Sequence, residues 1–192
     1  MTTNAIIDLV MRLLKALGLI KPDAPTPPLP DDPVPPAPPE AVAIKYPEGN
    51  VKTFRPGTST PYGIPWTQVS RWEPQFKAAV LRVAPDWTAG PLFMSLMSVI
   101  ESNAQHYTTG KTTGTKAEVL VRGADAYDNV PAVGLMQVKC SFHQWRRPNA
   151  DCYTPEGNIE VATAIIVDGI KKYGSWEEAI RRIYFPADDV QR

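Results

Sequence analysis

The segment VIESNAQHY, residues 99–107, ends an apolar helical pattern with a glutamate, Glu101. Phe93, Met97 and Glu101 are spaced four residues apart, so in a helix their side chains project from the same side. A carboxyl group on an apolar face is costly to bury, and partial burial raises its pKa into the range that a general acid needs near neutral pH. Glu101 is therefore a candidate general acid; the alternative is a helix-terminal glutamate that bends to solvent.

Apolar residues at helical spacing predict further helices on both sides of this segment. Pro91 favours the start of the helix that carries Glu101, and Ser175 with Glu178 forms a capping box that opens a last helix. Residues 104–133 are rich in Gly, Thr, Asp and Lys, which predicts a long loop or a short hairpin. The expected apolar stripes are Val69, Trp72, Phe76, Val80 and Val83; Phe93, Leu96, Met97 and Ile100; and Ile159, Ala162, Ile166, Ile170 and Tyr173.

Four sequence elements in this order resemble the soluble lytic transglycosylase (SLT) family. They are Glu101-Ser102 at a helix end, GLMQ at residues 134–137, Asn158-Ile159 opening a helix, and Tyr184 one helix later. The resemblance covers about residues 66–186 and implies a mainly α, lysozyme-like domain over residues 60–192. Two departures stand out: residues 108–130 form an insertion, and Phe185 replaces the asparagine that follows the family's tyrosine.

The resemblance implies cleavage of the β-1,4 bond between N-acetylmuramic acid (MurNAc) and N-acetylglucosamine (GlcNAc) in peptidoglycan. Glu101 alone would protonate the glycosidic oxygen and then, as carboxylate, deprotonate the muramoyl 6-hydroxyl to form a 1,6-anhydro ring. Asp125 or Asp128 in the insertion could instead act as a second acid, which would make the enzyme a hydrolysing muramidase. The remaining predicted substrate-binding residues are Ser102, Tyr107, Met136, Gln137 and Tyr184.

The first 59 residues predict an appendage rather than a second domain. Residues 1–21 show an amphipathic pattern without the features of a signal peptide, which favours an anchor helix that docks on a protein partner. The alternatives are a helix that docks on a membrane surface and a short helix that packs back on its own domain. Residues 22–59 predict an extended linker, since residues 22–39 alone hold ten of the 21 prolines. An anchored enzyme without a signal peptide suggests delivery with a phage tail or virion; a secretion-system enzyme of the periplasm or cell wall is the alternative.

Composition excludes some classes of function. The 20 basic and 20 acidic side chains balance, so no basic field favours nucleic-acid binding. Cys140, Cys152 and the two histidines do not form a zinc pattern, and no cofactor is implied. The cysteines are either two buried thiols or one disulfide. Two non-enzymatic alternatives remain: an inactive assembly protein with a lysozyme-like fold, and a carbohydrate-binding module.

Overall fold

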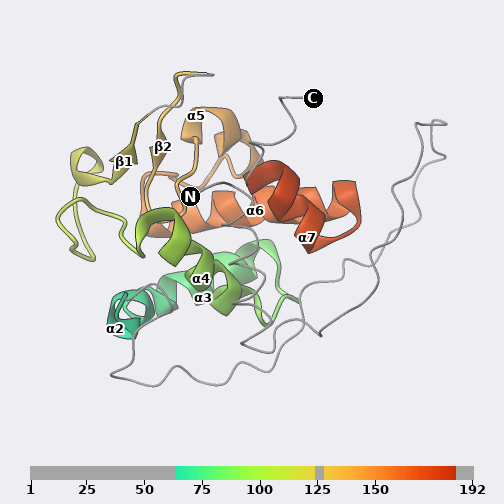
Figure 1. Ribbon diagram of the computed structural model, residues 1–192, viewed down its shortest axis with the longest axis horizontal. Coiled ribbons are helices and arrows are strands. Elements are labelled where there is room, and N and C mark those ends of the chain that lie inside the picture. Colours follow the sequence, from blue (N-terminus) through green and yellow to red (C-terminus); the bar gives the residue numbers. More distant parts are fainter. Residues whose placement is uncertain (1–63, 124–127, 185–192) are drawn as a thin grey trace.

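The computed structural model describes residues 64–123 and 128–184, which form a mainly helical domain with one small sheet (Figure 1). The predicted anchor helix at residues 1–21, the linker at 22–59, Asp125 and Phe185 all lie outside the described residues. Within the described part of the chain, no helix is both long enough and apolar enough to cross a membrane.

The first predicted apolar stripe divides between two helices, α2 (Trp66–Ser70) and α3 (Glu73–Val83). The helix is interrupted between them because Pro74 has no amide hydrogen to donate to the preceding turn. Proline is tolerated only in the first turn of a helix, and Pro74 lies in the first turn of α3. Val69, Trp72 and Phe76 are nevertheless all buried, so the predicted face is the one that packs. The pattern therefore identified the buried side chains except for Val83, which is half-buried, and it missed the helix boundary.

Helix α4 (Gly90–Ser102) forms the centre of the domain, with Pro91 in its first turn as predicted. It is buried on almost every side, because serines as well as apolar residues face its neighbours. The helix ends where Asn103 and Ala104 adopt left-handed backbone conformations with φ of 55° and 54°. Side chains from the preceding helical region brace this turn: Trp72 Nε1 donates to the Ala104 carbonyl at 2.9 Å. Glu101 thus lies in the last turn of a fixed helix.

The long helix α6 (Pro155–Tyr173) packs against α3 and against α7 (Trp176–Ala179). In Figure 1 it crosses the domain between the α2–α4 group and the small sheet. Thr154 caps α6 by accepting a hydrogen bond from the Gly157 amide, and Ser175 caps α7 by accepting one from the Glu178 amide. This is the Ser175 half of the predicted capping box, because the Glu178 carboxylate pairs with Arg181 and Arg182. A π-helical turn, η3 (Ile180–Tyr184), follows α7.

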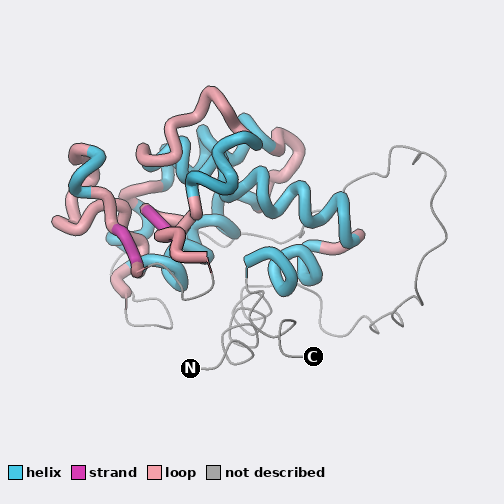
Figure 2. Tube along the Cα trace, turned by 90° about the horizontal axis from the view of Figure 1, so that it is seen from above, coloured by secondary structure: helices cyan, strands magenta, loops and turns pink. Residues whose placement is uncertain are grey.

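The predicted loop contains a short antiparallel sheet, which lies at one end of the domain (Figure 2). Strand β1 (Val121–Arg122) pairs with β2 (Ala132–Val133), with Val121 opposite Val133 and Arg122 opposite Ala132. A 3₁₀ turn, η1 (Lys116–Glu118), precedes the sheet. After it come α5 (Cys140–His143) and a second 3₁₀ turn, η2 (Gln144–Arg146).

The first turn of α6 has no room for a side chain at Gly157. A β-carbon added there would lie 2.0 Å from the Asp151 carbonyl oxygen, which is a backbone atom and cannot rotate away. We therefore expect Gly157→Ala to lower the free energy of unfolding by about 2–3 kcal/mol, despite the better helix propensity of alanine. Gly123→Ala, where a β-carbon would meet open space, is the control and should change stability by less than about 0.5 kcal/mol. Urea denaturation of both variants measures the difference; equal midpoints would contradict the expectation.

Candidate active site

Glu101 presents an unpaired acid to the interior. Its side chain is half-buried, and Oε1 is buried without a hydrogen-bond partner among the described residues. Burial raises the pKa of the carboxyl group from 4.5 to about 8, while the positive charge of Arg122 acts in the opposite direction. A carboxyl group with this pKa is protonated at neutral pH and can donate its proton to a leaving oxygen.

Ser102 connects the end of α4 to the turn at residues 134–137. Its hydroxyl donates to the Leu135 carbonyl at 2.7 Å and accepts a hydrogen bond from the Gln105 amide at 3.1 Å. The side chain is buried, so the predicted contact between Ser102 and substrate is wrong. The serine instead holds the 134–137 turn against the helix end that carries Glu101.

Gln137 contributes the second unpaired polar atom of this region. Its Nε2 donates to the Gly134 carbonyl at 2.7 Å, while Oε1 is buried and, within the described part of the chain, has no hydrogen-bond partner. Gln137 and Gly134 both have positive φ, 47° and 74°, so the turn is tight and glycine suits its first position. The two unpaired acceptors belong to Glu101, which precedes Ser102 in the chain, and to Gln137, which lies two residues after Leu135.

The side chains of His106 and Asn158 accept hydrogen bonds from backbone amides of the 134–137 turn. The Leu135 amide donates to His106 Nδ1 at 3.1 Å, and the Met136 amide donates to Asn158 Oδ1 at 2.7 Å. Because Nδ1 accepts a hydrogen bond, the imidazole proton lies on Nε2, which donates to the Tyr153 carbonyl at 2.9 Å. Burial lowers the pKa of His106, in keeping with this neutral form. No pattern along the chain relates His106 to residue 135 or 153, so the sequence alone indicates no role for it.

Cys140 and Cys152 form a disulfide, which decides between the two alternatives that the sequence left open. The bond supports the site through Asn158, whose Nδ2 donates to the carbonyls of Cys152 and Val133, both at 3.1 Å. Cys152 of the disulfide thus holds Asn158, Asn158 holds the 134–137 turn, and this turn contacts Ser102 at the end of α4.

Two further predicted substrate contacts are wrong. The side chain of Met136 is fully buried in the core, so it cannot line an open sugar site. Tyr107 is also buried, with its ring edge-on to His106 at a centroid distance of 4.7 Å, and cannot stack on a sugar. The backbone of Tyr184 belongs to η3, while its side chain lies outside the described residues.

Asp128 has a structural partner. Its Oδ2 forms an ion pair with Lys139 Nζ at 2.6 Å, and its Oδ1 accepts a hydrogen bond from the Val130 amide. These contacts stabilise the loop that leads into β2. Because the carboxylate of Asp128 is paired with Lys139, Asp128 is less suited to act as a second acid.

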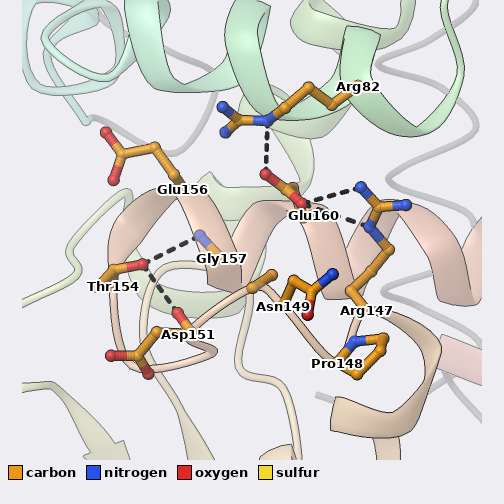
Figure 3. A pocket seen from close by; sticks show the side chains of 10 residues that line it. Arg82, Arg147, Pro148, Asn149, Asp151, Thr154, Glu156, Gly157 and Glu160 are labelled. Atoms are coloured by element: carbon orange, nitrogen blue, oxygen red, sulfur yellow. Dashed lines mark hydrogen bonds and ion pairs between the residues drawn. The ribbon is translucent and has the colours of Figure 1, made fainter.

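A pocket of about 440 Å³ lies at the start of α6 and shares no lining residue with the region around Glu101 (Figure 3). Glu160 lies between two arginines there, 2.6 Å from Arg82 Nε and 3.2 Å from Arg147 Nη2. The buried carboxylate is therefore compensated, and the cluster connects α3, α6 and the loop after η2. In the residues that the structure describes, no group of three or more His, Cys, Asp or Glu side chains could hold a metal ion.

A mainly helical domain has the features of a lysozyme-like glycosidase when the end of its central helix carries a glutamate whose pKa is raised by burial and a small antiparallel sheet completes the domain, as here. Residues 88–181 match the family model described as "Transglycosylase SLT domain". Residues 88–181 thus form a transglycosylase SLT domain, and the domains of this family are peptidoglycan lytic transglycosylases. Comparison with curated proteins and with solved structures found no match to the chain.

Proposed function

We propose that Glu101 is the single catalytic acid/base of this domain and that cleavage of the MurNAc–GlcNAc bond leaves 1,6-anhydro-MurNAc ends. The observation that carries the proposal is the unpaired, desolvated carboxyl group of Glu101 beside the 134–137 turn. Such a group is protonated in the resting enzyme and becomes a strong base after it has given up its proton.

The reaction has two proton transfers through the same side chain. Glu101 first protonates the glycosidic oxygen, the bond from that oxygen to C1 of MurNAc breaks, and GlcNAc leaves with a new hydroxyl group. The Glu101 carboxylate then takes the proton of the MurNAc 6-hydroxyl as O6 forms a bond to C1. The ring closes, the carboxyl group is regenerated, and no water is consumed. Gln137 would bind a sugar hydroxyl through its unpaired Oε1.

Product analysis tests this proposal against the muramidase alternative. Purified peptidoglycan is digested with the full chain, and the released muropeptides are identified by mass spectrometry. We expect products lighter than hydrolysed muropeptides by one water. Products with ordinary reducing ends would instead identify a muramidase and direct attention to Asp125 and Asp128. The ion pair of Asp128 with Lys139 favours the first outcome.

The inactive assembly protein is the remaining alternative for a chain with this fold. It predicts that a folded protein releases no muropeptides from walls of several types. The unpaired carboxyl group of Glu101 argues against it. Such a group destabilises the fold, and a catalytic role accounts for its presence where an inactive protein would not need it.

We also propose that the domain acts outside the cytoplasmic membrane, on a phage tail or virion to which residues 1–21 attach it. The disulfide supports an oxidising location, since such bonds persist outside the reducing cytosol. The amphipathic pattern of residues 1–21 and the prolines of residues 22–39 support an anchored and tethered enzyme. Detection of this chain at constant stoichiometry in purified particles tests the attachment; finding it only as a free periplasmic protein would contradict it.

A further inference from the structure

Leu120, the residue immediately before strand β1, is hydrogen-bonded to two segments of the proposed site. The Leu120 amide donates to the His106 carbonyl at 2.8 Å, and the Leu120 carbonyl accepts from the Gly134 amide at 2.7 Å. The first contact connects Leu120 to the segment that follows Glu101, and the second connects it to the 134–137 turn. The inserted segment is therefore built into the site rather than appended to the domain surface.

Arg122, the second residue of β1, lies opposite Ala132, two residues before the 134–137 turn. Its side chain is exposed, yet its charge lies close enough to Glu101 to act on the carboxyl group. The other arginines of the described ranges have hydrogen-bond or ion-pair partners: Arg71, Arg82, Arg146, Arg147, Arg181 and Arg182. Arg122 has none among the described residues. An exposed guanidinium can bind an anionic group of a ligand.

The substrate of the proposed reaction supplies such an anion. Each MurNAc carries, through its lactyl group, a short peptide stem with free carboxylates, and the bond cleaved is on that same sugar. A guanidinium binds a carboxylate through two parallel hydrogen bonds, which lysine cannot reproduce. We infer that Arg122 is a specificity-determining residue that binds a peptide-stem carboxylate of the MurNAc positioned at Glu101. This inference rests on the proposed function.

The test compares three forms of one substrate: glycan strands with peptide stems, the same strands after an amidase has removed the stems, and strands whose stem carboxylates have been converted to amides. Values of kcat/KM are measured for the wild type, Arg122→Ala, Arg122→Lys and Lys111→Ala. Lys111 is the matched control, because it is an exposed cation of the same insertion.

We expect Arg122→Ala to lower kcat/KM on stem-bearing strands by about ten- to a hundredfold, the range for a hydrogen bond to a charged group. On stem-free or amidated strands its activity should match that of the wild type. Arg122→Lys should recover part of the loss, and Lys111→Ala should behave as wild type. An equal loss on all three substrates would overturn the inference, because Arg122 would then act only on the chemistry of Glu101.

Binding measurements separate this inference from the proposed function. Dissociation constants are measured for Glu101→Gln and for Glu101→Gln with Arg122→Ala, using stem-bearing and amidated strands. A weaker affinity of the double variant for stem-bearing strands alone supports the role of Arg122, even if the wild type releases no anhydro products. Equal affinities of the two proteins for both substrates would overturn it, even if the wild type is an active transglycosylase.

Discussion

Replacing Glu101 with glutamine is expected to lower the rate of glycan cleavage by about a hundred- to ten-thousandfold, the contribution of a general acid/base. The amide has nearly the shape of the carboxyl group but neither donates a proton to the leaving oxygen nor accepts one from the 6-hydroxyl. Release of muropeptides by the purified variant measures the loss. Glu177→Gln, at a glutamate in the first turn of α7, is the control and should retain wild-type activity.

The same carboxyl group sets a pH dependence whose sign follows from its raised pKa. Activity that requires protonated Glu101 should decline as the pH rises through about 8. Between pH 4.5 and about 8 the folded protein binds more protons at this position than the unfolded chain, so stability falls as the pH rises. Glutamine does not ionise. Glu101→Gln should therefore gain stability relative to the wild type on going from pH 5 to pH 9.

These two readouts distinguish a catalytic glutamate from a structural one. A structural Glu101 predicts that the glutamine variant loses stability together with activity. The catalytic role predicts lost activity in a protein that unfolds at an equal or higher denaturant concentration at pH 9. Retention of anhydro product formation by Glu101→Gln would exclude Glu101 as the acid.

Removing the Cys140–Cys152 disulfide should have the largest effect on stability. A covalent link across a separation of 12 residues restricts the unfolded chain and contributes about 3 kcal/mol in the loop-entropy model. We expect the double variant Cys140→Ser, Cys152→Ser to lose about that much free energy of unfolding. Chemical denaturation of the variant and the oxidised wild type measures the difference.

Reduction with dithiothreitol provides the internal control. It should lower the stability of the wild type toward that of the double serine variant and leave the variant itself unchanged. Activity should fall as well, because the Cys152 carbonyl holds Asn158, which in turn holds the Met136 amide in the 134–137 turn. Unchanged stability of the wild type after complete reduction would contradict a structural role for the bond.

The corrections to the sequence-based site share one physical cause. Ser102, Met136 and Tyr107 belong to or flank the motifs that carry the resemblance, but their side chains point into the core. A motif shows which residues occur together and does not show whether each one faces the substrate or supports the backbone that does. Helical periodicity identifies a buried face only for regular segments, and residues 134–137 form an irregular turn.

Local chemistry by itself determined the framework of this protein. The start of α4 at Pro91, the cap of α7 at Ser175 and the apolar side of α4 that carries Glu101 all depend on residues within a few positions of one another. Such short-range signals are present in the chain before it folds. The Glu101 and 134–137 motifs also indicated the SLT family that the family comparison shows.

Only the tertiary structure decided how the site is held and charged. His106 meets Leu135 across 29 positions, Asn158 meets Met136 across 22, and the pairing of β1 with β2 brings Arg122 within electrostatic reach of Glu101. The choice of disulfide over free thiols likewise depends on where the chain brings Cys140 and Cys152. Contacts between distant residues depend on the folded path of the chain, and no local pattern encodes that path.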